Sequence, residues 1–223
     1  MKYERMLPGE IERVRAEVPI AVLPWGALEW HGYHQAIGLD GLKAQAFADA
    51  VAERIGGISL PVLYCGHQTL KPYMGFGHTI EISEETMRLL ARDFVSQLAE
   101  EDFKVIVIIS GHGNPRQLEL LEEGAAPSAE ATGVKVLVIA DGQAIDDPVY
   151  PLDHAAKWET SILSYLAPDL VDLGKYESDI PAKEQGVLGE DPIENASPEV
   201  GEAAFKEIVE NIAQQALKLL EAE

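Results

Sequence analysis

Cysteine is almost absent from this sequence, and long apolar runs are absent altogether. The single cysteine, Cys65, excludes a disulfide within the chain and is typical of proteins of a reducing cytoplasm, where we expect this one. The N-terminal stretch MKYERMLPGEIERVRAEVP carries charges throughout, so we expect no secretory signal peptide. Because no apolar run approaches the ~20 residues that a membrane helix needs, we expect no membrane insertion.

Positive charge is also scarce. The chain has 17 lysines and arginines against 38 aspartates and glutamates, a formal net charge of -21 at pH 7. This balance argues against nucleic acid and anionic membranes as partners. An anionic substrate would need local positive charge, and a metal ion is one way to supply it.

A length of 223 residues with 47% hydrophobic content suits one domain, residues 1–223.

Short apolar runs alternate with longer helical patterns. The runs at 19–24, 57–64, 104–110 and 134–141 are continuous in Val, Ile and Leu, which predicts buried strands. Helical periodicity covers 41–55, 84–99 and 201–221, with Ser83 as the expected N-cap of the second helix. This alternation predicts a single three-layer α/β domain with a mainly parallel sheet. The stretch 177–200 is expected to be an irregular surface segment.

Histidines and carboxylates follow three of the predicted strands. They occur in WGALEWHGYHQAIGLD (25–40), SGHGNPR (110–116) and PLDHAAKWETS (151–161), and comprise Glu29, His31, His34, Asp40, His112, His154 and Glu159. Because ligands gather beyond the carboxyl ends of parallel strands, we expect these groups to meet at one sheet edge. Each alone has a simpler explanation, such as helix capping by Asp40. Together they favour a site for zinc, manganese or iron over calcium or magnesium.

These segments resemble the creatininase (creatinine amidohydrolase) family. GALEWHGYHQAIGLD is similar to the family's Gly-x-x-Glu-x-His-Gly-x-His-x-x-x-Gly-x-Asp, SGHGNP to its Asn-Gly-His-Gly-Gly-Asn, and DHAAKWETS to its Asp-His-Ala-Gly-Glu-x-Glu-Thr-Ser. The segments YCGHQTLKPYMGFGHTIEIS (64–83) and GVLGEDPIENASPEVGEAA (186–204) also match family segments, so the likeness spans most of the chain.

The resemblance implies a metal-dependent hydrolase with two divalent ions per chain, zinc first, with manganese or iron as alternatives. One ion would be held by Glu29, Asp40 and His112, and the other by His31, Asp40 and Glu159, with Asp40 bridging. The reaction would be hydrolysis of a C–N bond in a small cyclic or formyl amide. His154 would donate a proton or brace the intermediate, and Glu159 would also belong to the catalytic machinery. The family further implies a homo-oligomer, commonly a hexamer.

Some residues depart from the family pattern. Asn114 stands where some members carry a glutamate, which is why the second carboxylate is assigned to Glu159. Residues 113–153 contain no tryptophan to stack on a flat ring such as creatinine. Formamide hydrolysis or cleavage of small peptides on the same site are therefore alternatives. A non-catalytic ligand-binding α/β protein is another, although no Gly-x-Gly-x-x-Gly or Walker-type loop follows any strand.

The other polar and aromatic residues near these motifs are interpreted conservatively. We expect the loop histidines His67 and His78 and the basic side chains of Lys71 and Arg116 to be solvated on the surface. We expect the three tryptophans to pack around the site. No base accompanies the cysteine, which makes it a poor nucleophile. These residues are His67, His78, Lys71, Arg116, Trp25, Trp30, Trp158 and Cys65.

Overall fold

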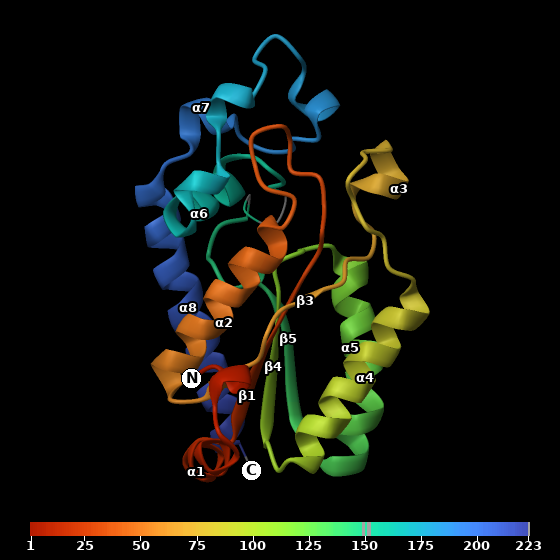
Figure 1. The fold of residues 1–223 in the computed structure, drawn as a ribbon, viewed down its shortest axis with the longest axis vertical. Coiled ribbons are helices and arrows are strands. Elements are labelled where there is room, and N and C mark those ends of the chain that lie inside the picture. The colour runs from red at the N-terminus through yellow and green to blue at the C-terminus, as the bar shows by residue number, and fades with distance from the viewer. Residues whose placement is uncertain (149, 151–152, 223) are drawn as a thin grey trace.

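A parallel β-sheet forms the centre of the computed structural model, which describes residues 1–148, 150 and 153–222 (Figure 1). Its strands are β1 (Ile20–Gly26), β2 (Ile58–Ser59), β3 (Leu63–Tyr64), β4 (Val105–Ser110) and β5 (Lys135–Ala140). The order is β2-β1-β4-β5, and β3 pairs with β1 further along its length. Every pairing is parallel, so the predicted α/β fold with a parallel sheet is confirmed.

The predicted strand at 57–64 is in fact two short strands. Pro61 has no backbone N–H to donate to a ladder, and the chain leaves the sheet between β2 and β3 at this point. The Gln45 side chain takes over the hydrogen bonding across the break, because its amide donates to the Leu60 carbonyl and accepts from the Val62 N–H. The prediction of one continuous strand was wrong for this reason.

Helices cover both faces of the sheet (Figure 1). One face carries α2 (Leu39–Ile55), α6 (Lys157–Leu166) and α8 (Pro198–Glu221), and the other carries α4 (Glu84–Glu100) and α5 (Pro115–Thr132). Shorter elements are α1 (Pro8–Glu17), α3 (Leu70–Met74), α7 (Pro192–Asn195) and 3-10 turns at Tyr3–Arg5, Asp141–Gln143, Pro168–Leu170, Leu173–Lys175 and Ala182–Gln185. No described helix is long and apolar enough to cross a membrane.

The helix ends follow their capping residues. Ser83 accepts a hydrogen bond from the Thr86 N–H at the start of α4, as predicted. The helix predicted at 201–221 begins earlier, at Pro198, because Ser197 accepts from the Val200 N–H. The segment 177–200 is irregular apart from short turns and α7, and the last three residues of that stretch already belong to α8.

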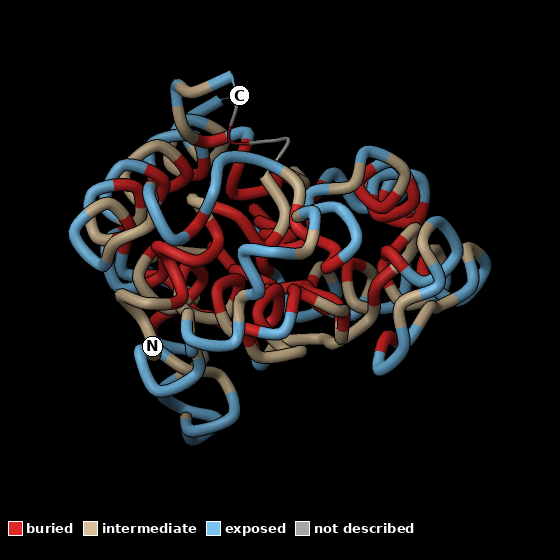
Figure 2. Tube along the Cα trace, turned by 90° about the horizontal axis from the view of Figure 1, so that it is seen from above, coloured by how far each residue is buried: buried red, intermediate tan, exposed pale blue. Residues whose placement is uncertain are grey.

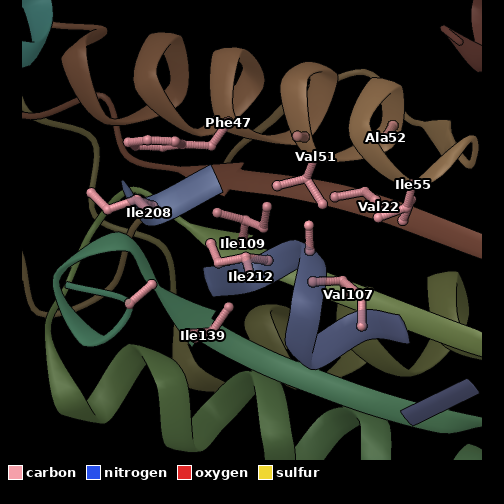
Figure 3. Close-up of a cluster of buried hydrophobic side chains, with 14 of the residues drawn as sticks. Val22, Phe47, Val51, Ala52, Ile55, Val107, Ile109, Ile139, Ile208 and Ile212 are labelled. Carbon is pink, nitrogen blue, oxygen red and sulfur yellow. The ribbon is translucent and has the colours of Figure 1, made fainter. Parts of the chain in front are cut away.

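The core lies in two layers, because alternate strand residues point to opposite faces of the sheet. Figure 3 shows the first layer, where strand side chains meet Phe47 and Val51 of α2 and Ile208 and Ile212 of α8. The strand residues of this layer are Ile20, Val22, Val105, Val107, Ile109 and Ile139. The second layer joins Ala21, Leu23, Ile106 and Ile108 to residues of α4 and α5. Figure 2 shows the buried chain enclosed by exposed loops and helix faces.

The N-terminus of α2 packs directly on the ends of β1 and β4. A Cβ atom at Gly26 would lie 2.4 Å from the Gly41 nitrogen, and one at Gly111 would lie 2.0 Å from the Asp40 carbonyl oxygen. Only glycine permits this approach of backbone to backbone. The contact places Asp40, in the first turn of α2, over the carboxyl edge of the sheet.

We predict that Gly111→Ala destabilises the fold, because the added methyl group would displace the first turn of α2. The free energy of unfolding measured in urea should fall by about 1–3 kcal/mol, as for other overpacked positions. Gly113→Ala is the matched control, since a Cβ atom at Gly113 would meet nothing within 4 Å. Equal stability of the two variants would contradict this account of the packing.

Candidate metal centre

A cluster of buried histidines and carboxylates lies at the carboxyl edge of the sheet. His112 Nδ1 is 2.9 Å from Glu29 Oε2 and 3.6 Å from Asp40 Oδ2. All three side chains are buried, and each offers a ligand atom within 4.8 Å of the others. The structure therefore brings together the residues predicted to hold the first ion.

A second group shares Asp40 with the first. His31 Nε2 is 3.2 Å from Asp40 Oδ1 and 3.4 Å from Glu159 Oε2. These three side chains are also buried, and their ligand atoms again lie within 4.8 Å of one another. Asp40 thus directs one carboxylate oxygen toward each group, the arrangement that a bridging ligand requires.

Four separate segments supply these side chains. Glu29 and His31 lie on the loop after β1. A hydrogen bond from the Glu29 N–H to the Ile37 carbonyl joins the two sides of this loop. Asp40 lies in the first turn of α2, His112 follows β4, and Glu159 lies in the first turn of α6. Parallel strands end at one edge, so residues far apart in sequence converge there.

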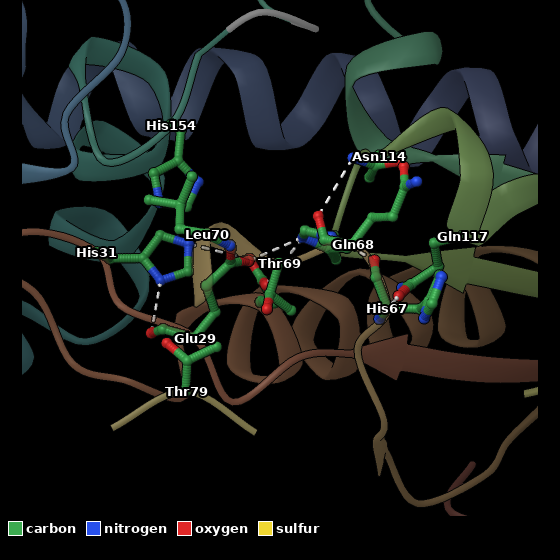
Figure 4. A network of polar contacts seen from close by, with 12 residues as sticks. Glu29, His31, His67, Gln68, Thr69, Leu70, Thr79, Asn114, Gln117 and His154 are labelled. Atoms are coloured by element: carbon green, nitrogen blue, oxygen red, sulfur yellow. Dashed lines mark hydrogen bonds and ion pairs between the residues drawn. The ribbon is translucent and has the colours of Figure 1, made fainter. Parts of the chain in front are cut away.

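Backbone carbonyls fix which ring nitrogen of each histidine faces the carboxylates. His31 Nδ1 contacts the Glu29 carbonyl at 3.0 Å, as Figure 4 shows, and His112 Nε2 contacts the His67 carbonyl at 3.1 Å. Because a carbonyl only accepts, these nitrogens carry the hydrogen, which leaves His31 Nε2 and His112 Nδ1 to bind a cation.

The His67 prediction needs correction. His67 is half-buried instead of being a solvated surface histidine, with Nδ1 2.7 Å from the Ile82 carbonyl, and its backbone orients His112. His78 is exposed, as predicted. The sequence carried no signal for the role of His67, because it is the carbonyl and not the side chain that contacts His112.

Some buried polar atoms of the cluster make no hydrogen bond within the described part of the chain. These atoms are Glu29 Oε2, His31 Nε2 and both carboxylate oxygens of Asp40. Glu29 Oε1, in contrast, accepts from the Leu70 N–H at 2.6 Å. Buried polar atoms without hydrogen bonds are costly, and divalent cations bound by the two groups would satisfy all four. Imidazole and carboxylate donors suit zinc or manganese, so the residues fit the metal centre that the sequence predicts.

Opposite charges dominate the electrostatics of the cluster. Burial alone would lower the pKa of His31, but Asp40 and Glu159 outweigh it and raise that pKa to about 10. The Glu29 carboxylate outweighs burial at His112 in the same way, and the pKa of His112 rises to about 9. Burial would raise the pKa of Glu159, yet Lys43 and His31 lower it to about 2. The Glu159 carboxylate is therefore ionised and ready to bind a cation.

His154 lies against the cluster from the side of the cleft. Its ring stacks on His31 (Figure 4), with the centroids 4.3 Å apart. Its Nε2 is 2.8 Å from the Trp30 carbonyl. Burial lowers the pKa of His154, which favours the neutral ring. Because the carbonyl holds the Nε2 hydrogen, Nδ1 is the nitrogen available for chemistry. His154 also offers a ligand atom within 4.8 Å of Glu29 and His31.

Two other motif residues have structural contacts instead of facing the cluster. His34 Nε2 is 3.0 Å from the Ala155 carbonyl and thereby ties the first loop to the loop before α6. Asn114 caps α5, where its Oδ1 accepts from the Arg116 N–H at 2.9 Å and its Nδ2 donates to the Gln68 carbonyl. The Asn114 side chain is thus used elsewhere, which agrees with assigning the second carboxylate to Glu159.

The basic side chains and the tryptophans near the motifs have the surface and packing roles that the sequence predicts. The guanidinium of Arg116 pairs with Glu84, Glu119 and Glu123 on the surface, while the exposed Lys71 donates to the Thr79 carbonyl. The tryptophans pack around the site. Trp25 donates its indole N–H to the Cys65 carbonyl, the Trp30 ring stacks on Phe76, and the Trp158 ring packs against Tyr150.

Sequence reasoning missed Lys43, which contacts Glu159. Its position three residues after Asp40, on the buried face of α2, was the available signal.

An open cleft of about 490 Å³ leads to the cluster. Its floor includes Glu29, His112, His154 and Glu159, and the 3-10 turn Ala182–Gln185 contributes Lys183 to its lining. Apolar wall residues are Leu70, Tyr73 and Met74 of α3, and Leu188. No tryptophan is among the described lining residues, as the sequence predicts for the 113–153 stretch.

Comparisons with known proteins identify the family of this chain. The family described as creatininase, creatinine amidohydrolase, matches residues 4–216. The chain belongs to this family of metal-dependent amidohydrolases. A creatinine amidohydrolase of Pseudomonas putida is 30% identical over 191 residues, which cover 76% of this chain and 73% of that protein. A mycofactocin precursor peptide peptidase of Mycobacterium ulcerans is 29% identical, over 76% of this chain and 70% of that protein.

Solved structures are similar over almost the whole chain. A crystal structure of creatininase superposes with a TM-score of 0.86 at 24% identity, covering 100% of this chain and 98% of that one, and this match supports the fold. A mutant creatininase described as Zn-Zn type has a TM-score of 0.86 at 25% identity, covering 99% and 98%. A structure named creatininase Mn has a TM-score of 0.84 at 25% identity, covering 99% of each chain.

We predict that metal binding releases protons. At pH 8, below the pKa values of about 10 for His31 and about 9 for His112, both rings are protonated in the metal-free chain. A cation must displace one proton from each ring, so filling the cluster should release about two protons. The apparent affinity for each ion should therefore rise with pH by about tenfold per unit below pH 8.

Calorimetry in buffers of different ionisation enthalpy measures this release. His31→Gln should lower the number of protons released by about one, because it removes one of the two protonated rings. The absence of proton release on binding to the unaltered chain would contradict the prediction.

Proposed function

We propose that this chain is a dinuclear metal hydrolase that cleaves the C–N bond of a small amide, cyclic or formyl. The observation that carries the proposal is the placement of Asp40, whose two buried oxygens make no hydrogen bond with any described residue and face separate groups of potential ligands. A single carboxylate shared in this way is what a pair of neighbouring ions requires.

Each ion has its own set of residues in this proposal. Glu29, Asp40 and His112 would hold one, and His31, Asp40 and Glu159 the other. Zinc and manganese are the first candidates, because structures of similar proteins are named for them and the donors suit both. When bound, such a pair supplies a water that is nucleophilic at neutral pH and polarises the amide carbonyl.

The residues around the pair would move the protons. Burial lowers the pKa of His154 and favours its neutral ring, and its Nδ1 has no hydrogen-bond partner among the described residues, so it can accept the proton of the attacking water. The same nitrogen can then donate that proton to the departing amide nitrogen. The carbonyl of Trp30 holds the ring in place throughout, at 2.8 Å from Nε2.

Cleavage of a short peptide on the same site is the second candidate. The cleft of about 490 Å³ is open, and its apolar wall on α3 suits side chains of a peptide. The likeness to a mycofactocin precursor peptide peptidase supports this alternative. A non-catalytic role in ligand binding is less well supported, because it does not explain why both buried oxygens of Asp40 lack hydrogen bonds within the described chain. The sequence also predicts that the chain is one domain, that it forms a homo-oligomer and that it is cytoplasmic, and these three points stay predictions.

We predict that the purified chain holds about two transition ions and that Asp40→Ala holds none, since this substitution removes a ligand from both groups. Elemental analysis after dialysis measures the content. Glu53→Ala, which removes an exposed carboxylate from the same helix, should keep both ions. Full occupancy in Asp40→Ala would end the bridging proposal.

A panel of cyclic amides, formamides and short peptides, tested with the metal-loaded chain, distinguishes the two candidate functions.

We predict that His154→Ala keeps both ions and the fold but loses about 10²–10⁴ in kcat, the usual contribution of a proton-transfer residue. The measurement is steady-state turnover of the best substrate from the panel, with metal content determined on the same sample. His78→Ala is the control, because this histidine is exposed. Near-native turnover would show that His154 only braces its loop, and loss of an ion would show that it is a ligand.

A further inference from the structure

Lys43 is a lysine buried in the interior, with only 2% of its surface exposed. It lies one turn after Asp40 on α2, so a candidate ligand and this cation share one rigid helix. Its ammonium nitrogen is 2.7 Å from Glu159 Oε1 and 3.0 Å from Asp141 Oδ2. Burying a charged group is costly unless it is paired, and here both partners are carboxylates that are themselves buried.

Asp141 is anchored independently of the lysine. Its Oδ2 accepts from the Tyr150 hydroxyl at 3.0 Å, and its Oδ1 accepts from the Gly142 N–H at 3.0 Å. Asp141 follows β5 directly, in a 3-10 turn at the sheet edge. The ammonium of Lys43 is therefore fixed on one side by a rigid carboxylate and presents its charge to Glu159 on the other.

This arrangement leaves a single oxygen of Glu159 facing the cluster. Oε1 is taken by the ammonium, while Oε2 accepts from the Ala155 N–H at 2.7 Å and lies 3.4 Å from His31 Nε2. The ion pairs of Lys43 are confined to Asp141 and Glu159 within the described chain, so they do not include Glu29 or Asp40. The lysine thus contacts one of the two ligand groups directly, through Glu159.

We propose that Lys43 is a positioning residue that holds Glu159 for the ion bound by His31, Asp40 and Glu159, and that the other ion does not need it. The inference rests on the proposed dinuclear site. Without the ammonium, two buried carboxylates face a shared space with no cation between them, and Glu159 loses the contact that fixes its orientation. The group of Glu29, Asp40 and His112 retains all its contacts.

The test compares the affinities of the two ions in the unaltered chain and in Lys43→Met. Titration with Zn²⁺ against a competing chelator should show two ions in the unaltered chain. In Lys43→Met one ion should bind about 10–100-fold more weakly, the usual effect of removing an outer contact to a ligand, while the other changes by less than about threefold. Lys175→Met, which removes an exposed positive charge, should leave both affinities unchanged.

A second readout distinguishes positioning from general loss of structure. With Co²⁺ filling both positions, the visible absorption should change in Lys43→Met and return toward the original spectrum in Lys43→Arg, whose guanidinium can again pair with Glu159. If Lys43→Met does not fold, the double variant Lys43→Met with Asp141→Asn replaces it. This pair of changes removes one positive and one negative charge, so the net charge of the interior is kept.

The outcomes separate the two proposals. Fewer than two ions in the unaltered chain would refute the dinuclear site itself. Two ions there, with both affinities unchanged in the folded Lys43 variant, would overturn the role of Lys43 alone. Equal weakening of both ions would also overturn it, because the proposal confines the effect to one ligand group.

Discussion

The contact between the first turn of α2 and the ends of β1 and β4 is the constraint on which the rest of the site depends. Glycines at 26 and 111 let backbone meet backbone there, and the contact sets Asp40 above the sheet edge. From that place Asp40 reaches both His31 and His112, which come from different strand ends. A side chain at either glycine would move α2 outward and separate the two ligand groups from the residue they share.

Charge balance is the second requirement of this interior. Three buried carboxylates, Glu29, Asp40 and Glu159, lie together in a chain whose formal net charge is already -21. In the metal-free chain, protonated His31 and His112 offset them, which is why the pKa values of these rings rise despite burial. Divalent ions would replace those protons, and Lys43 would continue to neutralise the outer oxygen of Glu159.

Most of the contacts that orient the ligands come from the backbone. The Leu70 N–H holds Glu29, the His67 carbonyl holds His112, and the Ala155 N–H holds Glu159. The loop at 67–70 is itself fixed by Glu81, which accepts from the N–H groups of Gln68 and Thr69. A backbone donor or acceptor does not depend on the side chain of its residue, so these orienting contacts tolerate substitution at 67, 70 and 155.

The sequence by itself determined the fold class and which residues converge, because continuous apolar strands demand a parallel sheet covered on both faces and parallel strands end at one edge. Glu29, His31, Asp40, His112 and Glu159 are among the seven candidates found in this way, and the family resemblance singled them out as ligands. The proline that divides the strand at 61 was visible in the sequence, but the sequence could not show that His67 acts through its carbonyl or that Lys43 is buried against Glu159. Those features depend on distances between segments remote in the chain, and only tertiary packing sets such distances.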